Sequence, residues 1–220
     1  MKGPLLLLME HCTNGDLHTF LRSRKHLLHQ WKHKEDVSSG NMCLMDSMEM
    51  AINISDGMCF LSSHGVVHKN LSARSILLDH NNQVKIADYG KAKYLSNHKD
   101  VHKTEVGDLI SVRWQAPECI QFERFTSSSD VWAFGVLLWE LFTLGGEPYP
   151  GIVCHDLLAY LRTGERLNYP NSCPEEVYNL MLTCWCMTPT ERPCFLYLVR
   201  MLQDIVQREI ESQLPNTTSF

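Results

Sequence analysis

Apolar residues recur at helical spacing through most of the chain. From Leu44 to Ser63 they return every three or four positions, polar residues fill the other side, and Gly65 follows as a stop. This pattern predicts an amphipathic helix. A second segment opens at Asp130, ends before Gly145 and is apolar almost all round, which predicts a helix at the centre of the domain.

Two further helices are expected near the C-terminus. Pro174, followed by Glu175 and Glu176, is typical of a helix start. A last helix is expected from about Glu191. The positions expected to face inward are Val177, Leu180, Met181 and Cys184 in the first of these helices, and Phe195, Leu198, Val199, Leu202 and Val206 in the second.

Strand signals are few. A short apolar run spans residues 5–9, and the segments 75–79 and 83–87 flank three polar turn residues, as in a small hairpin. Residues 25–41 are polar and rich in His and Lys, which indicates a loop insertion. The chain is therefore expected to be mainly α, with a hairpin and loops at one edge of a helical bundle, where chemistry is most often found.

The composition is that of an ordinary globular protein and excludes several other classes. Hydrophobic residues make up 44% and charged residues 20% of the chain, which argues against long disorder or a coiled coil. The net charge of −5 and the lack of a basic block give nucleic-acid binding little support. The longest apolar run, 131–139, is too short to cross a bilayer, so no membrane segment is expected in this chain. Nine cysteines without a C-x-x-C pair indicate free thiols in a reducing compartment.

Several motifs occur in a fixed order along the chain. The sequence is H-K-N-L-S-A-R-S from His68 to Ser75, D-Y-G from Asp88 and W-Q-A-P-E from Trp114. These motifs resemble the catalytic loop (H-R-D-L-A-A-R-N), the D-F-G metal motif and the W-M-A-P-E segment of protein tyrosine kinases. The G-G-E-P-Y-P-G run that ends at Gly151 is similar to that of receptor-type members.

The resemblance covers nearly the whole chain and implies an α+β protein-kinase-like fold. Most of this fold would be the large C-lobe, a helical bundle with a small β-hairpin. Residues 1–16 would form the last N-lobe strand and the hinge, 17–210 the C-lobe with its insert at about 25–41, and 211–220 a polar tail. Most of the N-lobe would be absent, because no G-x-G-x-x-G loop precedes the hinge-like stretch 9–16.

The resemblance also implies a site for ATP and Mg²⁺. Asp88 would bind the Mg²⁺ that bridges the phosphates, and Arg74 would face the γ-phosphate or the substrate hydroxyl. The other nucleotide contacts would come from Glu10 and Cys12 (backbone bonds to adenine), Asp16 (ribose) and Leu77 (the floor under adenine).

Several positions depart from the family pattern. Asn70 stands where the family has the aspartate that accepts the proton of the tyrosine hydroxyl, and an amide can orient a hydroxyl but cannot accept its proton. Ser75 replaces the asparagine that holds the second metal, and its hydroxyl would ligate Mg²⁺ less well from a shorter stem. Lys69 replaces an arginine and lacks the bidentate fork. Ser111 and Gln115 replace a proline and a methionine in the strip that receives the substrate tyrosine.

Other polar residues are expected to have structural roles. The resemblance implies that Asp130 hydrogen-bonds the backbone of the catalytic loop from the buried helix. Glu118 and Arg192 are similar to the buried ion pair of the family, and His68 is expected to pack under Tyr89. These contacts would support the loop without taking part in chemistry.

Three functions remain open on the sequence alone. The chain is expected to be a catalytically impaired pseudokinase that binds a protein partner, such as another kinase, because Asn70 and Ser75 change chemistry together. The alternatives are the catalytic lobe of an ATP-dependent protein tyrosine kinase in signalling, and an incomplete product with no function of its own. ATP and Mg²⁺ are expected to bind weakly. The expected location is the cytoplasm, as a free protein or as the cytoplasmic part of a membrane receptor.

Overall fold

The computed structural model describes residues 8–25, 44–95 and 111–213. The helices are α1 (Leu17–Ser23), α2 (Leu44–Ser63), α3 (Pro117–Phe122), α4 (Ser127–Phe142), α5 (Leu157–Arg162), α6 (Glu175–Cys184) and α7 (Phe195–Gln213). The strands are β1 (Val66–Val67), β2 (Ile76–Leu78), β3 (Val84–Ile86) and β4 (Lys93–Tyr94). Both the predominance of helix and the small hairpin were predicted from the sequence, and both are confirmed.

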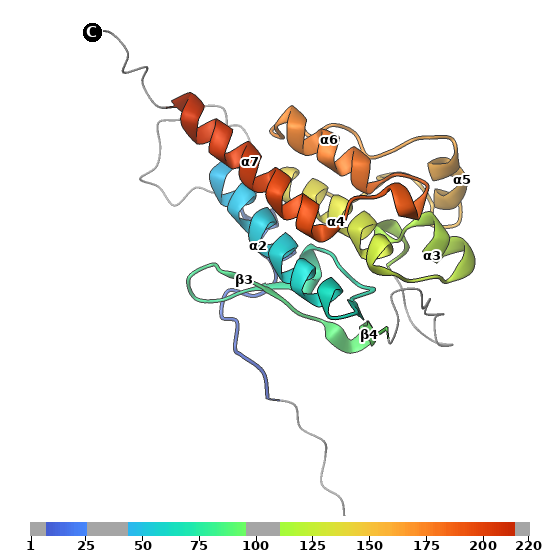
Figure 1. Cartoon of the computed structure of the whole chain (residues 1–220), viewed down its shortest axis with the longest axis horizontal. Coiled ribbons are helices and arrows are strands. Elements are labelled where there is room, and N and C mark those ends of the chain that lie inside the picture. Colours follow the sequence, from blue (N-terminus) through green and yellow to red (C-terminus); the bar gives the residue numbers. More distant parts are fainter. Residues whose placement is uncertain (1–7, 26–43, 96–110, 214–220) are drawn as a thin grey trace, which may run out of the picture.

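Helix α4 lies at the centre of the bundle. Every residue from Ser129 to Phe142 is buried, as the all-round apolar pattern predicted. The helix begins three residues before the expected Asp130, because Thr126 and Ser129 form a reciprocal capping box that satisfies the first backbone N–H groups. Figure 1 shows α4 lying behind α7, with α6 alongside.

Helices α2 and α7 run side by side and pack against each other (Figure 1). The bounds of α2 agree with the prediction. The last helix was expected from about Glu191, but α7 begins at Phe195. Proline disfavours helical backbone at the residue before it, so At the other end α7 continues to Gln213, into the stretch expected to be a polar tail.

The hairpin lies at one edge of the bundle, beside α2. Strands β2 and β3 pair antiparallel with Leu77 opposite Lys85, and an isolated bridge joins Asp16 to Leu77. The segment before α1 is therefore attached to the hairpin by backbone hydrogen bonds, including Asn14 N–H to Leu78 O. A second, shorter pair joins β1 to β4.

Some expectations fall partly or wholly outside the described residues. The apolar run 5–9 was expected to be a strand; residues 5–7 are not described, and Leu8 and Met9 are exposed and not in a strand. The insert at 25–41 is described only at Lys25. Among the described helices, none has the length and apolar character needed to cross a membrane.

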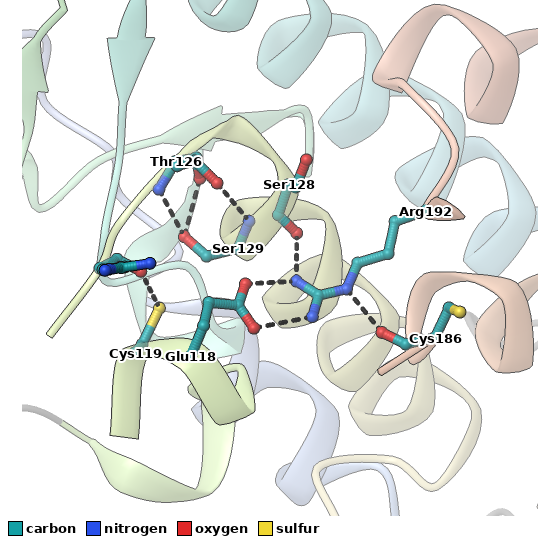
Figure 2. Close-up of polar contacts among 8 residues, drawn as sticks. Glu118, Cys119, Thr126, Ser128, Ser129, Cys186 and Arg192 are labelled. Carbon is teal, nitrogen blue, oxygen red and sulfur yellow. Dashed lines mark hydrogen bonds and ion pairs between the residues drawn. The ribbon is translucent and has the colours of Figure 1, made fainter. Parts of the chain in front are cut away.

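A buried ion pair joins α3 to the loop before α7. The Arg192 guanidinium donates to both carboxylate oxygens of Glu118, at 2.6 and 2.8 Å, and also to the carbonyls of Ser128 and Cys186 (Figure 2). The Arg192 side chain is fully buried, whereas that of Glu118 is 14% exposed. This pair was expected from the family resemblance, and it fixes the end of the segment that leads from the D-Y-G motif back into the bundle.

Replacing Arg192 by alanine should destabilise the fold strongly. The change leaves Glu118 without its partner, so we expect Arg192→Ala to lower the free energy of unfolding by about 3 to 5 kcal/mol. The matched control is Arg208→Ala, because Arg208 forms a 2.8 Å pair with Glu176 in which the side chains are 51% and 58% exposed. That variant should lose no more than about 1 kcal/mol. Urea unfolding followed by tryptophan fluorescence measures both, and equal losses would contradict the assigned role of the buried pair.

Candidate functional site

The candidate catalytic loop follows β1 and is held in place by Asp130 of α4. The Asp130 carboxylate accepts the backbone N–H groups of His68 at 2.7 Å and Lys69 at 3.0 Å. Lys69 has a positive φ of 68°, which a side chain rarely adopts unless its surroundings impose it. The expected structural role of Asp130 is thereby confirmed.

The imidazole of His68 connects this loop to the strand before the D-Y-G motif. Its Nε2 lies 2.8 Å from the carbonyl oxygen of Ala87, and its Nδ1 accepts the backbone N–H of Asn70 at 3.3 Å. Burial lowers the pKa of His68, so the ring is neutral, with the proton on Nε2. The ring also packs against Tyr89, with 5.6 Å between centroids, as expected.

Asn70 and Asp88 are in direct contact. The Asn70 amide nitrogen donates to a carboxylate oxygen of Asp88 at 2.5 Å, and its carbonyl oxygen accepts from the Lys91 ammonium at 3.4 Å. A carboxylate only accepts hydrogen bonds and an ammonium only donates them, so these two neighbours determine which way the amide points. Asp88 itself has left-handed backbone, with φ 60° and ψ 47°. The contact therefore gives Asp88 a neutral donor where a kinase would offer a metal ion.

Ser75 has a different role from the one expected. Its hydroxyl donates to the Ser72 carbonyl at 2.8 Å and accepts the Ser72 backbone N–H at 2.9 Å, and only 1% of the residue is exposed. The hydroxyl thus caps the 3₁₀ turn Ala73–Ser75. We therefore do not propose Ser75 as a metal ligand. Arg74, in the same turn, is exposed, and its charge helps to lower the pKa of His18 after the larger effect of burial.

A second buried carboxylate of α4 holds the far end of the catalytic loop. One oxygen of Glu140 accepts the Ala73 backbone N–H at 2.9 Å and the Trp114 indole N–H at 2.8 Å, while the other oxygen is buried without a hydrogen bond. Burial raises the pKa of Glu140 to about 7, and it does the same for Asp130. Sequence inspection missed Glu140, although a charged residue inside an apolar helix is itself a signal of a specific buried partner.

The predicted nucleotide residues form a separate group near the hairpin. Asp16 and Leu77 are brought together by their bridge, but the Asp16 carboxylate caps α1 by accepting from the Thr19 backbone and hydroxyl. Glu10 forms an exposed ion pair with Lys85 at 3.3 Å. Cys12 is half-buried, and no contact links it to the catalytic loop among the described residues.

The strip that follows the undescribed residues 96–110 is tied to the catalytic loop. The Gln115 amide donates to the Lys69 carbonyl at 3.2 Å, a contact that the sequence did not reveal. Arg113 donates to Glu147 at 2.6 Å and to the carbonyls of Pro148 and Ile152. Both residues therefore serve the fold of this strip, and Gln115 is buried.

Comparison with known proteins agrees with this geometry. The family model of the protein tyrosine and serine/threonine kinases matches residues 1–202, so the chain belongs to this family. The chain is 38% identical over 205 residues to fibroblast growth factor receptor 1 of Pleurodeles waltl and 37% identical to that of Xenopus laevis. These matches confirm the receptor-type resemblance. They cover 93% of this chain and 25% of each receptor, so the chain spans about a quarter of the length of these relatives.

The family uses ATP and Mg²⁺, and the residues present here fit a magnesium site poorly. One oxygen of Asp88 is occupied by the Asn70 amide, and the Ser75 hydroxyl is occupied by Ser72. Within the described ranges, no group of three or more His, Cys, Asp or Glu side chains is placed to hold a metal ion. Mg²⁺ prefers an octahedron of oxygen ligands, and a single shared carboxylate supplies little of it.

The buried carboxylates predict how stability depends on pH. The pKa of Glu140 is raised from 4.5 to about 7 in the folded chain, so between these values the folded chain keeps a proton that the unfolded chain has released. The free energy of unfolding should therefore fall as the pH rises through this window. Glu140→Gln keeps the oxygen acceptor and removes the titration, so its unfolding free energy should fall less steeply. Urea titrations at a series of pH values test this, and parallel curves for the two proteins would refute it.

Proposed function

We propose that this chain is a kinase-like domain that does not transfer phosphate and acts by binding another protein. The observation that carries the proposal is the contact between Asn70 and Asp88. In the family, the position of Asn70 is an aspartate that accepts a proton, and that of Asp88 is a metal ligand. Here an amide occupies the first position and donates to the second, so one contact affects both functions.

The loss of the proton acceptor is large enough to matter alone. A positioned general base contributes about 10² to 10⁴ in rate, which corresponds to roughly 3 to 5.5 kcal/mol of barrier. Asn70 cannot supply this, because an amide nitrogen and oxygen have no basicity near neutral pH. Weak binding of ATP and Mg²⁺ is proposed for the same reason, since the Asp88 carboxylate already has a donor.

Protein binding is the function that such a domain retains. The scaffold around the loop is intact, with Asp130, Glu140 and the Glu118–Arg192 pair all making their contacts. A rigid lobe with an inactive loop can still present its surface to a partner, and another kinase is the class of partner we propose. The proposed location is the cytoplasm, either as a free protein or as the cytoplasmic part of a receptor.

A second candidate function is the catalytic lobe of an ATP-dependent protein tyrosine kinase in signalling. It is favoured by the presence of Asp88 and Arg74 and by the likeness to fibroblast growth factor receptors. In that case the chain would transfer the γ-phosphoryl group of ATP to a protein tyrosine. The two candidates differ in whether any such transfer occurs.

A phosphotransfer assay separates the candidates. We expect the purified chain with ATP and Mg²⁺ to label a tyrosine peptide no faster than a buffer blank. We also expect Asn70→Asp alone to stay inactive, because Ser75 remains bonded to Ser72 and supplies no metal ligand. Labelling that disappears in Asp88→Ala would refute the proposal, whereas labelling that persists in Asp88→Ala comes from a contaminating kinase.

A further inference from the structure

A groove opens between α1, the start of α2 and the turn of the β2–β3 hairpin, away from the catalytic loop. Its volume is about 340 Å³, and its floor is formed by the apolar side chains of Phe20, Met50 and Val84. A second hollow shares Phe20, Arg24 and Asn82 with it and extends it toward Asn14. We call the two together the hairpin groove.

The turn presents unused amide groups to the groove. Asn81 and Gln83 line it, and their side chains make no hydrogen bond within the described part of the chain. Asn82 uses its oxygen to accept from Asn14 at 2.9 Å, which leaves its amide nitrogen without a partner there. Each such amide offers a donor, an acceptor or both, which are the groups needed to pair with a peptide backbone.

The turn is held in shape before any ligand arrives. One Asp79 oxygen accepts the backbone N–H groups of Asn81 at 2.8 Å and Gln83 at 2.9 Å. The pKa of Asp79 is lowered, chiefly by the hydrogen bond from Gln83. A wall that is already ordered loses less entropy when a ligand binds to it.

The opposite wall is acidic. Asp46 and Glu49 lie three residues apart on α2, and therefore on one face of the helix, with Asn53 one turn further along. Glu49 is exposed and has no ion pair within the described residues. The one basic residue of the groove, Arg24, stacks over the Phe20 ring at 3.6 Å and donates to the Phe20 carbonyl. The net field of the α2 wall therefore favours a cation.

From this complementarity we infer that the hairpin groove binds an extended, basic peptide segment of a partner protein. An apolar side chain of the segment packs on Phe20, Met50 and Val84, its backbone bonds to the turn amides, and a Lys or Arg faces Glu49. The inference rests on the proposed function, in which the domain acts by protein binding, and it gives that binding a location and a chemistry.

Fluorescence anisotropy with defined peptides tests the inference. The probe is a fluorescein-labelled peptide, Arg-Arg-Thr-Leu-Ser-Leu, and the comparison peptides replace both arginines by glutamate or both leucines by serine. The intact chain should bind the probe at least about tenfold more tightly than either comparison peptide. In Glu49→Lys the preference between the arginine and glutamate peptides should reverse. Glu49 is exposed, so this change leaves the fold intact.

The control variant makes the same charge change elsewhere. Glu165 is exposed in the loop after α5, on the side of the molecule far from the hairpin (Figure 1), and Glu165→Lys should leave both affinities unchanged. Equal effects of the two variants, or no preference for the probe, would overturn the inference. Sedimentation in which the unmodified chain is dimeric and Glu49→Lys monomeric would assign the groove to a second copy and also overturn it. None of these results bears on phosphotransfer, so the proposed function fails or stands separately.

Discussion

Two carboxylates buried in one helix determine where the catalytic loop lies. Helix α4 is apolar along most of its length, and Asp130 and Glu140 direct their oxygens at the backbone of the loop and at the Trp114 indole. Because a buried carboxylate is costly unless it is hydrogen-bonded, these contacts tie the loop to the centre of the bundle. The Glu118–Arg192 pair attaches the segment that follows in the same way. The loop thus has a backbone shape that does not depend on its own side chains.

This division of labour explains how a kinase-like fold can be kept while its chemistry changes. The backbone at position 70 is held by His68 and Asp130, so the side chain there is free to differ without cost to the fold. An aspartate would bring a second negative charge beside Asp88, and a cation would then be needed between them. The amide of Asn70 removes that need, because it neutralises the contact by donating a hydrogen bond. One side chain therefore changes both the proton acceptor and the demand for metal.

Much of the fold could be predicted from the sequence, because long helices carry a repeated pattern. The bounds of α2 and the inward face of α6 agreed with it, and the buried position of α4 was evident from its composition. The short helices α1, α3 and α5 were missed, since six or seven residues give too few turns for a periodic signal. At the site, the motifs gave the positions but not the contacts. The Asn70–Asp88 bond joins residues from separate segments, and the inward turn of the Ser75 hydroxyl is a rotamer choice that sequence does not encode.

The central claim is that the Asn70 amide occupies Asp88 in place of a metal ion, and nuclear magnetic resonance observes this directly. The measurement follows the carboxylate carbon of Asp88 and the side-chain amide of Asn70 during a titration with millimolar MgCl₂. The account predicts that both signals stay in place, because the carboxylate keeps its amide partner. A saturable shift of the Asp88 signal, with loss of the hydrogen-bonded Asn70 amide, would show that the metal displaces the amide and would contradict the account.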